Sequence, residues 1–175
     1  MKSWKVIVAA FALVAAALIA CGCAGEESVA PSSSGLERAT VVYVVDGDTL
    51  CVQTEGVEGP QRVRLIGVDC PESVASDEYL ESTGKKNTAA GKAASAYTKA
   101  LLPSGTTVWL ERDVSDIDRY GRLLRYVWLE EPADVSSEAE AKTKMLNALL
   151  VEAGHAEPAA YEPDTAHKAL FEALQ

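Results

Sequence analysis

Three short segments rich in β-forming residues lie close together between residues 39 and 68. They are residues 39–45 (ATVVYVV), 49–54 and 61–68 (QRVRLIGV), separated by Asp46-Gly47-Asp48 and by a turn at 56–60. An Asp-Gly turn between apolar runs is a strong hairpin signal. Strands this short leave costly exposed edges unless their sheet closes on itself. The pattern therefore favours a small β-barrel.

The rest of the domain adds two strands and three helices. Helices are predicted at 89–102, ended by Pro103, at 142–153, ended by Gly154, and at 163–174. The further strands are 106–111 and 123–129, residues 73–88 form a long polar loop, and residues 130–141 form an acidic connector. Sheet and helices are partly segregated along the chain, which indicates an α+β fold with a five-stranded barrel.

The N-terminus is interpreted as a targeting segment, residues 1–20. Lys2 and Lys5 precede an unbroken apolar run, Val6 to Ala20, which is shorter than the about 20 residues of a membrane span. The run ends in Leu-Ile-Ala-Cys21, a sequence that resembles the lipobox of bacterial lipoproteins. We therefore expect cleavage before Cys21 and lipidation of that residue. The alternatives are an ordinary secretory signal or a retained N-terminal anchor.

Residues 21–38 show no apolar periodicity and are expected to form a flexible tether, followed by one domain at 39–175. The expected location is the bacterial cell envelope, with the domain extracytoplasmic and lipid-anchored to the membrane, or else secreted. Outside the cytoplasm a disulfide between Cys51 and Cys70 is permitted, and two buried thiols are the alternative.

The chain is acidic, with 16 Lys and Arg against 26 Asp and Glu and a formal net charge of −10. This charge excludes a globally basic surface that binds nucleic acid through bulk electrostatics. The acidity is concentrated near the C-terminus, because residues 126–175 hold ten acidic and three basic residues. Any attraction for an anionic substrate must therefore be local.

Charged residues interrupt the strand pattern at four places. Asp46 and Asp48 flank Gly47 in a turn, Arg64 lies within an apolar strand, Asp69 to Glu72 follows that strand, and Arg122 precedes the last strand. Paired aspartates with backbone carbonyls suit Ca²⁺ or Mg²⁺. Two arginines can bind phosphate oxygens, and a glutamate beside them can activate water. Taken singly, these features also fit a turn, a strand arginine that reaches solvent and a helix start.

The ordered motifs VVDGDTL, RVRLIGVDCPE, DRYGRLLRYVW and MLNALLVEAGHA make the chain resemble the staphylococcal nuclease-like (thermonuclease) family from about Thr40 to Phe171. The resemblance implies a five-stranded OB-like barrel with three α-helices. It also implies Ca²⁺-dependent hydrolysis of DNA and RNA that leaves 3′-phosphate products.

Site roles follow from the resemblance, motif by motif. Asp48 and Asp69 would ligate Ca²⁺ together with the backbone carbonyl of Cys70, and Asp46 would reach the metal through water. Glu72 would be the general base that accepts a proton from the attacking water. Arg64 and Arg122 would stabilise the five-coordinate phosphorus and the leaving 5′ oxygen. The substrate would also contact residues near the arginines and before the last helix, namely Arg119, Tyr120 and Tyr161.

The alternative function is a catalytically inactive OB-type module that binds nucleic acid or protein. The presence of both arginines, the glutamate and the two aspartates favours the enzyme, and no obligate protein partner is evident. One departure from the family is the segment HAEPAAYEP, which keeps only Tyr161 where two tyrosines are common. His155 and His167 are interpreted as a helix-end residue and a solvated residue.

Overall fold

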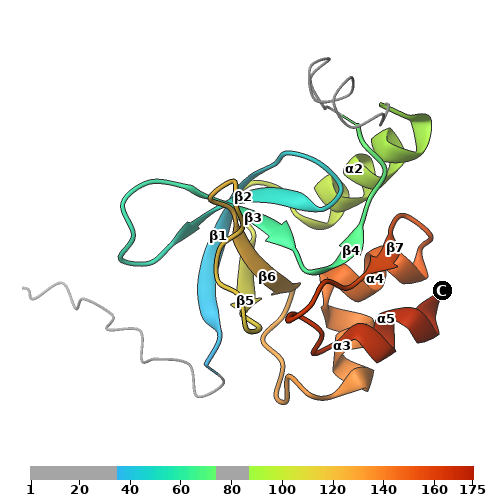
Figure 1. The fold of residues 1–175 in the computed structure, drawn as a ribbon. Helices are drawn as coiled ribbons and strands as arrows, with labels where there is room; N and C mark the ends of the chain where they lie inside the picture. Colours follow the sequence, from blue (N-terminus) through green and yellow to red (C-terminus); the bar gives the residue numbers. More distant parts are fainter. Residues whose placement is uncertain (1–34, 74–86) are drawn as a thin grey trace, which may run out of the picture. The chain divides into compact units, whose positions relative to one another are not determined.

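Five strands form a closed barrel in the order β1-β2-β3-β6-β5 (Figure 1). The computed structural model describes residues 35–73 and 87–175, so the predicted signal segment, Cys21 and most of the polar loop lie outside the described residues. The strands are β1 (Glu37–Val44), β2 (Thr49–Thr54), β3 (Gln61–Leu65), β5 (Thr107–Glu111) and β6 (Leu123–Trp128). The predicted α+β class and five-stranded barrel are confirmed.

The barrel follows from alternation along each strand. Leu50, Val52 and Val63 are fully buried inside it, so the residues between them face outward. All pairings are antiparallel except β3 with β6, which run parallel with Arg64 opposite Leu124. A register shift between Val41 and Tyr43 marks a bulge in β1.

The predicted strand 61–68 is wrong in one respect, because it breaks in two after Leu65. The second piece, β4 (Gly67–Asp69), leaves the barrel and pairs with β7 (Glu157–Ala159) in a separate two-stranded sheet. Gly67 has φ 75°, which L side chains rarely adopt, and a Cβ there would lie 2.7 Å from the Phe171 ring. This glycine therefore lets the chain turn out of the barrel towards the C-terminal helix.

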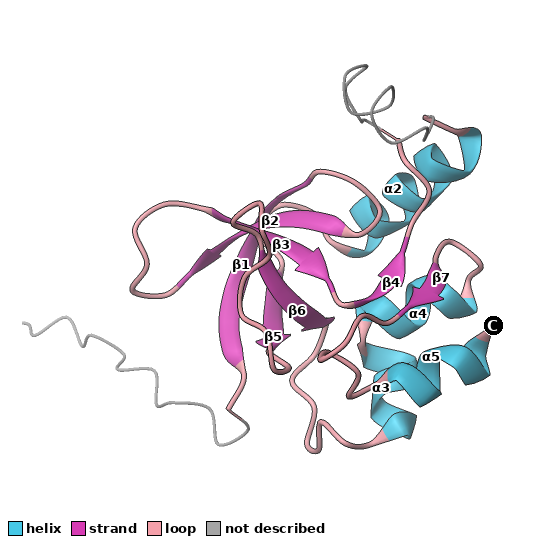
Figure 2. Cartoon of the chain, viewed as in Figure 1, coloured by secondary structure: helices cyan, strands magenta, loops and turns pink. Residues whose placement is uncertain are grey.

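Helix α2 (Ala89–Leu101) agrees with the predicted helix 89–102 (Figure 2). The Thr88 side chain accepts a hydrogen bond from the Gly91 N–H and so satisfies one free donor of the first turn. The buried face of α2 carries small residues only: Gly91, Ala94, Ser95 and Thr98.

The predicted helix 142–153 is wrong as a single element. It is two short helices, α3 (Glu138–Lys144) and α4 (Leu146–Glu152), so α3 begins within the predicted acidic connector. Met145 separates them in an extended conformation, fully buried and bridged to Trp128 of β6. The described residues thus hold four helices, because tertiary pairing with the barrel interrupts the helical pattern.

The C-terminal helix α5 (Lys168–Leu174) begins five residues later than the predicted 163–174. Its preceding residues are held by the barrel instead: the Ser115 N–H donates to Asp164, and the His167 ring lies 3.1 Å from the Glu111 carboxylate. His167 is 8% exposed, so its interpretation as a solvated residue was wrong.

We call Glu111, Asp113, Asp164 and their partners the latch, because they join β5 and the residues after it to α5. Glu111 also accepts a hydrogen bond from the Trp128 ring N–H, while Asp113 accepts from the Tyr126 hydroxyl and the Ala166 N–H.

Cys51 and Cys70 are buried free thiols, which selects one of the two expected alternatives. No helix among the described residues is long and apolar enough to cross a membrane.

Candidate active site

The turn between β1 and β2 presents two aspartates in different surroundings. Asp46 accepts hydrogen bonds from the Gly47 N–H and the Ser73 hydroxyl, at 2.7 and 2.6 Å. Asp48 is 3% exposed and accepts from the Cys70 N–H at 2.8 Å. Both carboxylates therefore tie this turn to the segment that follows β4.

Arg64 connects the predicted metal ligands to one another. Its guanidinium pairs with Asp48 through Nη1 and with Asp69 through Nη2, the latter at 2.6 Å. The two carboxylates expected on Ca²⁺ thus lie on either side of a guanidinium. The sequence pattern placed these residues in one site but did not indicate this direct contact.

The electrostatics of this group are unbalanced, because two carboxylates pair with one guanidinium and Asp46, a third carboxylate, acts on Asp48. Burial raises the pKa of Asp48 above its ordinary value, with Asp69 and Asp46 acting in the same direction and Arg64 and the Cys70 N–H opposing. Burial disfavours the charge of Arg64, but Asp48 and Asp69 outweigh it and hold the Arg64 pKa above its ordinary value. A further positive charge at this site would be stabilised.

Helix α2 fixes the backbone on both sides of the site. The Thr98 hydroxyl donates to the Gly47 carbonyl at 2.8 Å, and a Cβ on Gly47 would lie 2.8 Å from the Cys70 sulfur. At the other end of α2, the Thr88 N–H donates to the Glu72 carbonyl at 2.9 Å. A Cβ on Gly91 would lie 2.2 Å from that carbonyl oxygen. The small face of α2 therefore sets where Glu72 and the aspartate turn lie.

Arg122 precedes β6 and is oriented by its own turn. Asp118 accepts from the Arg122 backbone N–H and, at 2.7 Å each, from its Nε and Nη2 atoms. Partial burial works against the Asp118 charge, but these bonds and one from the Tyr120 N–H lower the Asp118 pKa. Because Leu123 and Leu124 of β6 pair with Val63 and Arg64 of β3, Arg122 directly precedes the part of β6 that lies beside Arg64.

The predicted substrate-binding residues divide into two places. The Tyr120 ring is 64% exposed, has the Arg119 guanidinium 4.8 Å and the Arg122 guanidinium 5.5 Å from its centroid, and its hydroxyl lies 2.7 Å from Arg119. Tyr161 is 73% exposed and bridges to Asp164, which holds Ser115. The first group therefore adjoins Arg122, and Tyr161 is linked to the same loop through Ser115.

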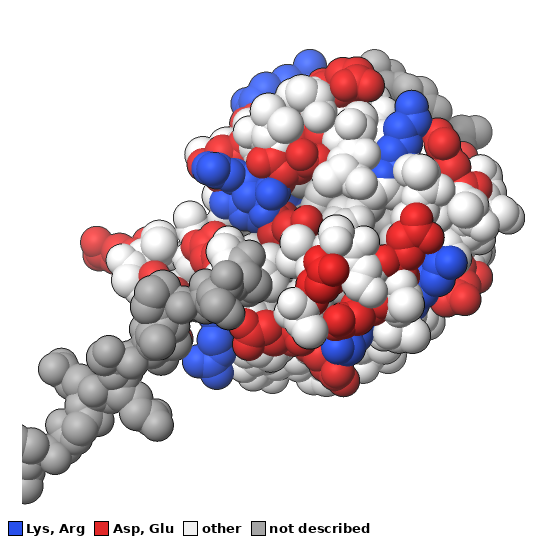
Figure 3. Space-filling view, turned by 90° about the horizontal axis from the view of Figure 1, so that it is seen from below, with Lys and Arg blue, Asp and Glu red and all other residues white. Residues whose placement is uncertain are grey.

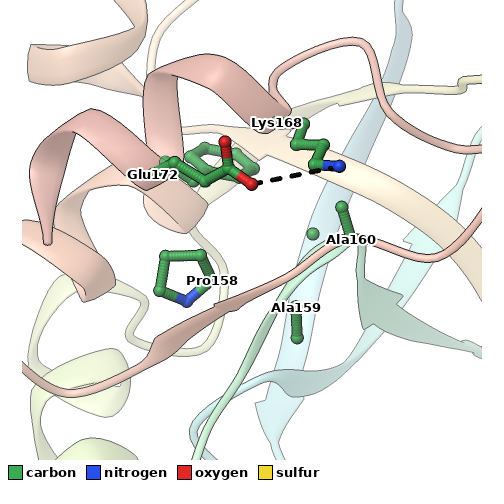
Figure 4. A pocket seen from close by; sticks show the side chains of 7 residues that line it. Pro158, Ala159, Ala160, Lys168 and Glu172 are labelled. Carbon is green, nitrogen blue, oxygen red and sulfur yellow. Dashed lines mark ion pairs between the residues drawn. The ribbon is translucent and has the colours of Figure 1, made fainter.

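Two hollows lie near β4 and β7. A groove of about 480 Å³ borders the site, because Asp69, Cys70 and Glu72 line it together with His155 and Glu157. His155 packs against Tyr97 of α2, with ring centroids 4.7 Å apart and the ring planes tilted by 44°. A smaller pocket of about 260 Å³ lies between β7 and α5, with Pro158, Ala159 and Ala160 facing Lys168 and Glu172 (Figure 4). No predicted site residue lines the smaller pocket.

The charge distribution agrees with the sequence expectation of local attraction. On the face seen in Figure 3, Lys and Arg form small groups among acidic and uncharged residues and make no broad basic surface. Anion binding would therefore depend on individual guanidinium groups such as Arg64 and Arg122.

The residues around Arg64 fit a divalent cation by the chemistry of their donors. Asp48 and Asp69 offer hard oxygen atoms, and a cation would offset the burial and the neighbouring negative charge that raise the Asp48 pKa. Within the described residues, no three His, Cys, Asp or Glu side chains are placed to hold a metal ion by themselves. A cation would therefore complete its ligands with backbone carbonyls and water, as predicted for Cys70 and Asp46.

The fold and the site formed by Arg64, Asp48 and Asp69 define a class of protein. It is an α+β domain built on a closed, OB-like five-stranded barrel of the staphylococcal nuclease type. The family described as "Staphylococcal nuclease homologue" matches residues 62–175. Thermonuclease from Staphylococcus intermedius is 36% identical over 139 residues, which cover 79% of this chain and 70% of that protein. The chain therefore belongs to the staphylococcal nuclease family.

Two further relatives carry nuclease names. Thermonuclease from Staphylococcus hyicus is 34% identical over 148 residues, covering 82% of this chain and 75% of that protein. Endonuclease YhcR from Bacillus subtilis is 32% identical over 113 residues, covering 65% of this chain and 9% of that protein.

Several residues that shape the site were missed from the sequence. Asp118 lies in the motif DRYGRLLRYVW, and its spacing of four from Arg122 is a usable local signal for their pairing. Ser73, Gly91 and Thr98 carried no signal, because each acts on a residue more than 15 positions away or through a backbone contact.

Proposed function

We propose that this chain is a Ca²⁺-dependent nuclease that hydrolyses phosphodiester bonds of DNA, RNA or both and leaves 3′-phosphate products. The observation that carries the proposal is Arg64 between Asp48 and Asp69, with Arg122 at the start of the neighbouring strand β6. Two guanidiniums facing one surface can hold the non-bridging oxygens of one phosphate. The nuclease names of the relatives support the same activity.

Each residue has a defined task in the proposed reaction. Glu72 accepts a proton from a water molecule, whose oxygen then bonds to phosphorus as the bond from phosphorus to the 5′ oxygen breaks. Arg64 and Arg122 donate hydrogen bonds to the oxygens that gain negative charge during attack, and preorganised charge of this kind is usually the largest catalytic contribution. The leaving 5′ oxygen takes up a proton from solvent water and departs as a hydroxyl, and Glu72 releases its proton to solvent.

Asp48, Asp69 and the Cys70 carbonyl would hold the Ca²⁺ ion, with Asp46 behind a water ligand. When bound, the ion supplies positive charge that offsets the anionic phosphate. Hydrogen bonds hold both aspartates in place: the Ser73 hydroxyl donates to Asp46, and the Cys70 N–H donates to Asp48. Substrate contacts beyond the phosphate come from Arg119, Tyr120 and Tyr161.

The remaining expectations stay part of the proposal. Removal of residues 1–20 and acylation of Cys21 would attach the domain to the outside of a bacterial membrane, or the protein would be secreted. Membrane attachment is tested by radiolabelled fatty acid incorporation into the full chain, with Cys21→Ala as the variant that loses the label.

The activity is tested by incubating the protein with single-stranded DNA, RNA and duplex DNA in Ca²⁺, then in excess chelator, then after Ca²⁺ is restored. We expect cleavage that stops with chelator and returns with Ca²⁺, and products that are substrates for a 3′-phosphatase. Cleavage that continues in chelator would contradict the metal dependence. Nucleic-acid binding without cleavage in any condition would support the inactive binding module.

A further inference from the structure

A cross-strand row on the outer face of the barrel lies next to the candidate active site. Tyr43 of β1 pairs with Cys51 of β2, which pairs with Arg62 of β3. Paired residues of adjacent strands point to the same face of a sheet. Tyr43 is 50% exposed and Arg62 is exposed, whereas the small Cys51 between them is 4% exposed. The row therefore presents the Tyr43 ring and the Arg62 guanidinium to solvent, on either side of the small, buried Cys51 side chain.

The bulge in β1 is what turns Tyr43 outward. Val41 and Val44 are both buried, although strict alternation would place residues three apart on opposite faces. The register shift between Val41 and Tyr43 adds one residue and re-aims the side chains that follow it. A large aromatic side chain is thereby held in solvent on a strand that would otherwise bury it.

This row is continuous with the site through β3. Arg62 precedes Arg64 by two residues and faces the same way, so their Cα atoms are about 7 Å apart at a rise of about 3.4 Å per residue. The residue opposite Arg64 is Thr49, which directly follows Asp48. A strand of nucleic acid whose phosphate lies on Arg64 reaches this row when it runs along β3 towards Arg62.

The charges of the row favour an anion. No carboxylate belongs to it, and among the residues that the structure describes no acidic side chain forms an ion pair with Arg62. Arg38, also on the barrel, differs because it pairs with Glu55 at 3.4 Å. In so acidic a domain, a guanidinium without such a partner next to Arg64 is a local attraction for phosphate.

We propose that Tyr43 and Arg62 form a second nucleotide subsite, which rests on the proposed function. Arg62 binds the phosphate adjacent to the one that is cleaved, and the Tyr43 ring stacks on the neighbouring base. An aromatic platform beside a cation is the usual way to hold single strands, because every base has a π-face and every nucleotide a phosphate. The subsite favours single-stranded polymers over mononucleotides, since a mononucleotide does not reach it.

The test measures binding of a fluorescent single-stranded oligonucleotide in Ca²⁺, with every variant built on Glu72→Gln to prevent cleavage. We expect Tyr43→Ala and Tyr43→Leu to weaken binding by about 5-fold to 150-fold, and Tyr43→Phe to bind like the parent because it keeps the ring. Arg62→Ala should reduce the slope of log affinity against log salt by about 0.7, the value for one phosphate on a single strand.

The matched control is Lys142→Ala on α3, which removes one positive charge outside the barrel and should leave the slope unchanged. Parent affinity and slope in both Tyr43→Leu and Arg62→Ala, with unchanged melting temperatures, would overturn the subsite. The same variants separate the two proposals. If the wild-type chain never cleaves while the Glu72→Gln chain binds through Tyr43 and Arg62, only the nuclease is contradicted. If the wild-type chain is active and its Glu72→Gln form is indifferent to both substitutions, only the subsite is contradicted.

Discussion

The candidate site and the latch are both built from hydrogen-bonded carboxylates, but their donors differ. In the site, Asp48 and Asp69 face one charged guanidinium, and the pKa of Asp48 is raised by burial and by its acidic neighbours. In the latch, the carboxylates accept instead from the Trp128 ring N–H, the Tyr126 hydroxyl and backbone N–H groups, and Glu111 also lies beside the His167 ring. Each carboxylate of the latch thus accepts a hydrogen bond from a side chain or backbone N–H of the same domain.

The two regions also differ in access. Asp69 and Glu72 line a groove of about 480 Å³, whereas His167 of the latch is buried against Tyr126 with ring centroids 4.5 Å apart. An unbalanced group at an open groove can change its partners when an anion or a cation arrives. In the latch, Trp128 and Asp164 are buried, so a change of partner there would leave a buried polar atom unpaired. The comparison therefore assigns chemistry to the first region and stability to the second.

The largest effect is expected at the general base. Glu72→Gln keeps the shape of the side chain but removes the proton acceptor, so turnover should fall by at least about 10²-fold. The melting temperature should stay near that of the parent, because Glu72 is half-buried and its backbone contacts do not change. Initial rates on single-stranded DNA in Ca²⁺ provide the measurement, and near-normal cleavage would remove Glu72 from this role.

Substitution of either arginine should lower turnover about as much as Glu72→Gln does, but the two variants should differ in stability. Arg64→Ala and Arg122→Ala each remove a donor to the phosphate, so each should lower turnover by at least about 10²-fold. Only Arg64→Ala also leaves the buried Asp48 without its charged partner, so it should be the less stable of the two in urea denaturation. Equal stability of the two variants would contradict the charge balance described for Asp48.

A smaller loss of activity is expected when helix α2 no longer holds the Glu72 backbone in place. Gly91→Ala places a Cβ against the Glu72 carbonyl, and displacement of a catalytic group by about 1 Å can cost up to about 10²-fold in rate. Alanine is the better helix former by about 1 kcal/mol, so a fall in melting temperature would itself show the clash. Ala93→Ser, on the exposed face of the same helix, is the control. Full activity in Gly91→Ala would show that α2 does not position Glu72.

A still smaller effect is expected where Arg122 is oriented. Asp118→Asn keeps an acceptor for the backbone bonds but removes the charge that holds the guanidinium, so kcat should fall by about 10-fold, equivalent to about 1.4 kcal/mol. The loss should appear in kcat more than in KM, because the arginine acts on charge that develops during the reaction. An unchanged kcat would mean that Arg122 is positioned by other contacts.

The smallest effect on activity belongs to the latch. Glu111→Ala leaves the Trp128 ring N–H and His167 without their shared acceptor, so stability should fall by about 1–3 kcal/mol. The rate per folded molecule should match the parent at a temperature where both are folded. Thermal denaturation and initial rates together check this, and a lower kcat with intact folding would erase the distinction between the two regions.

Short sequence patterns predicted many of the strands and helices of this domain, because these elements depend on residues that are close together in the chain. The strand Thr49–Thr54 and the helix from Ala89 were predicted with bounds that agree to within one residue, since alternation and capping are set by neighbouring residues. The loss of the single helix 142–153 at Met145 was not predictable, because the residue that interrupts it, Trp128, lies on a distant strand.

The sequence by itself determined the α+β barrel, the family and the set of charged residues at its edge, because these depend on periodicity and on motifs that are contiguous in the chain. Only the tertiary structure decided that Arg64 lies between Asp48 and Asp69, that Ser73 holds Asp46, that His167 is buried, and that the β1 bulge turns Tyr43 outward. Each of these depends on contacts between residues far apart in the chain or on strand register, and neither is set by local sequence.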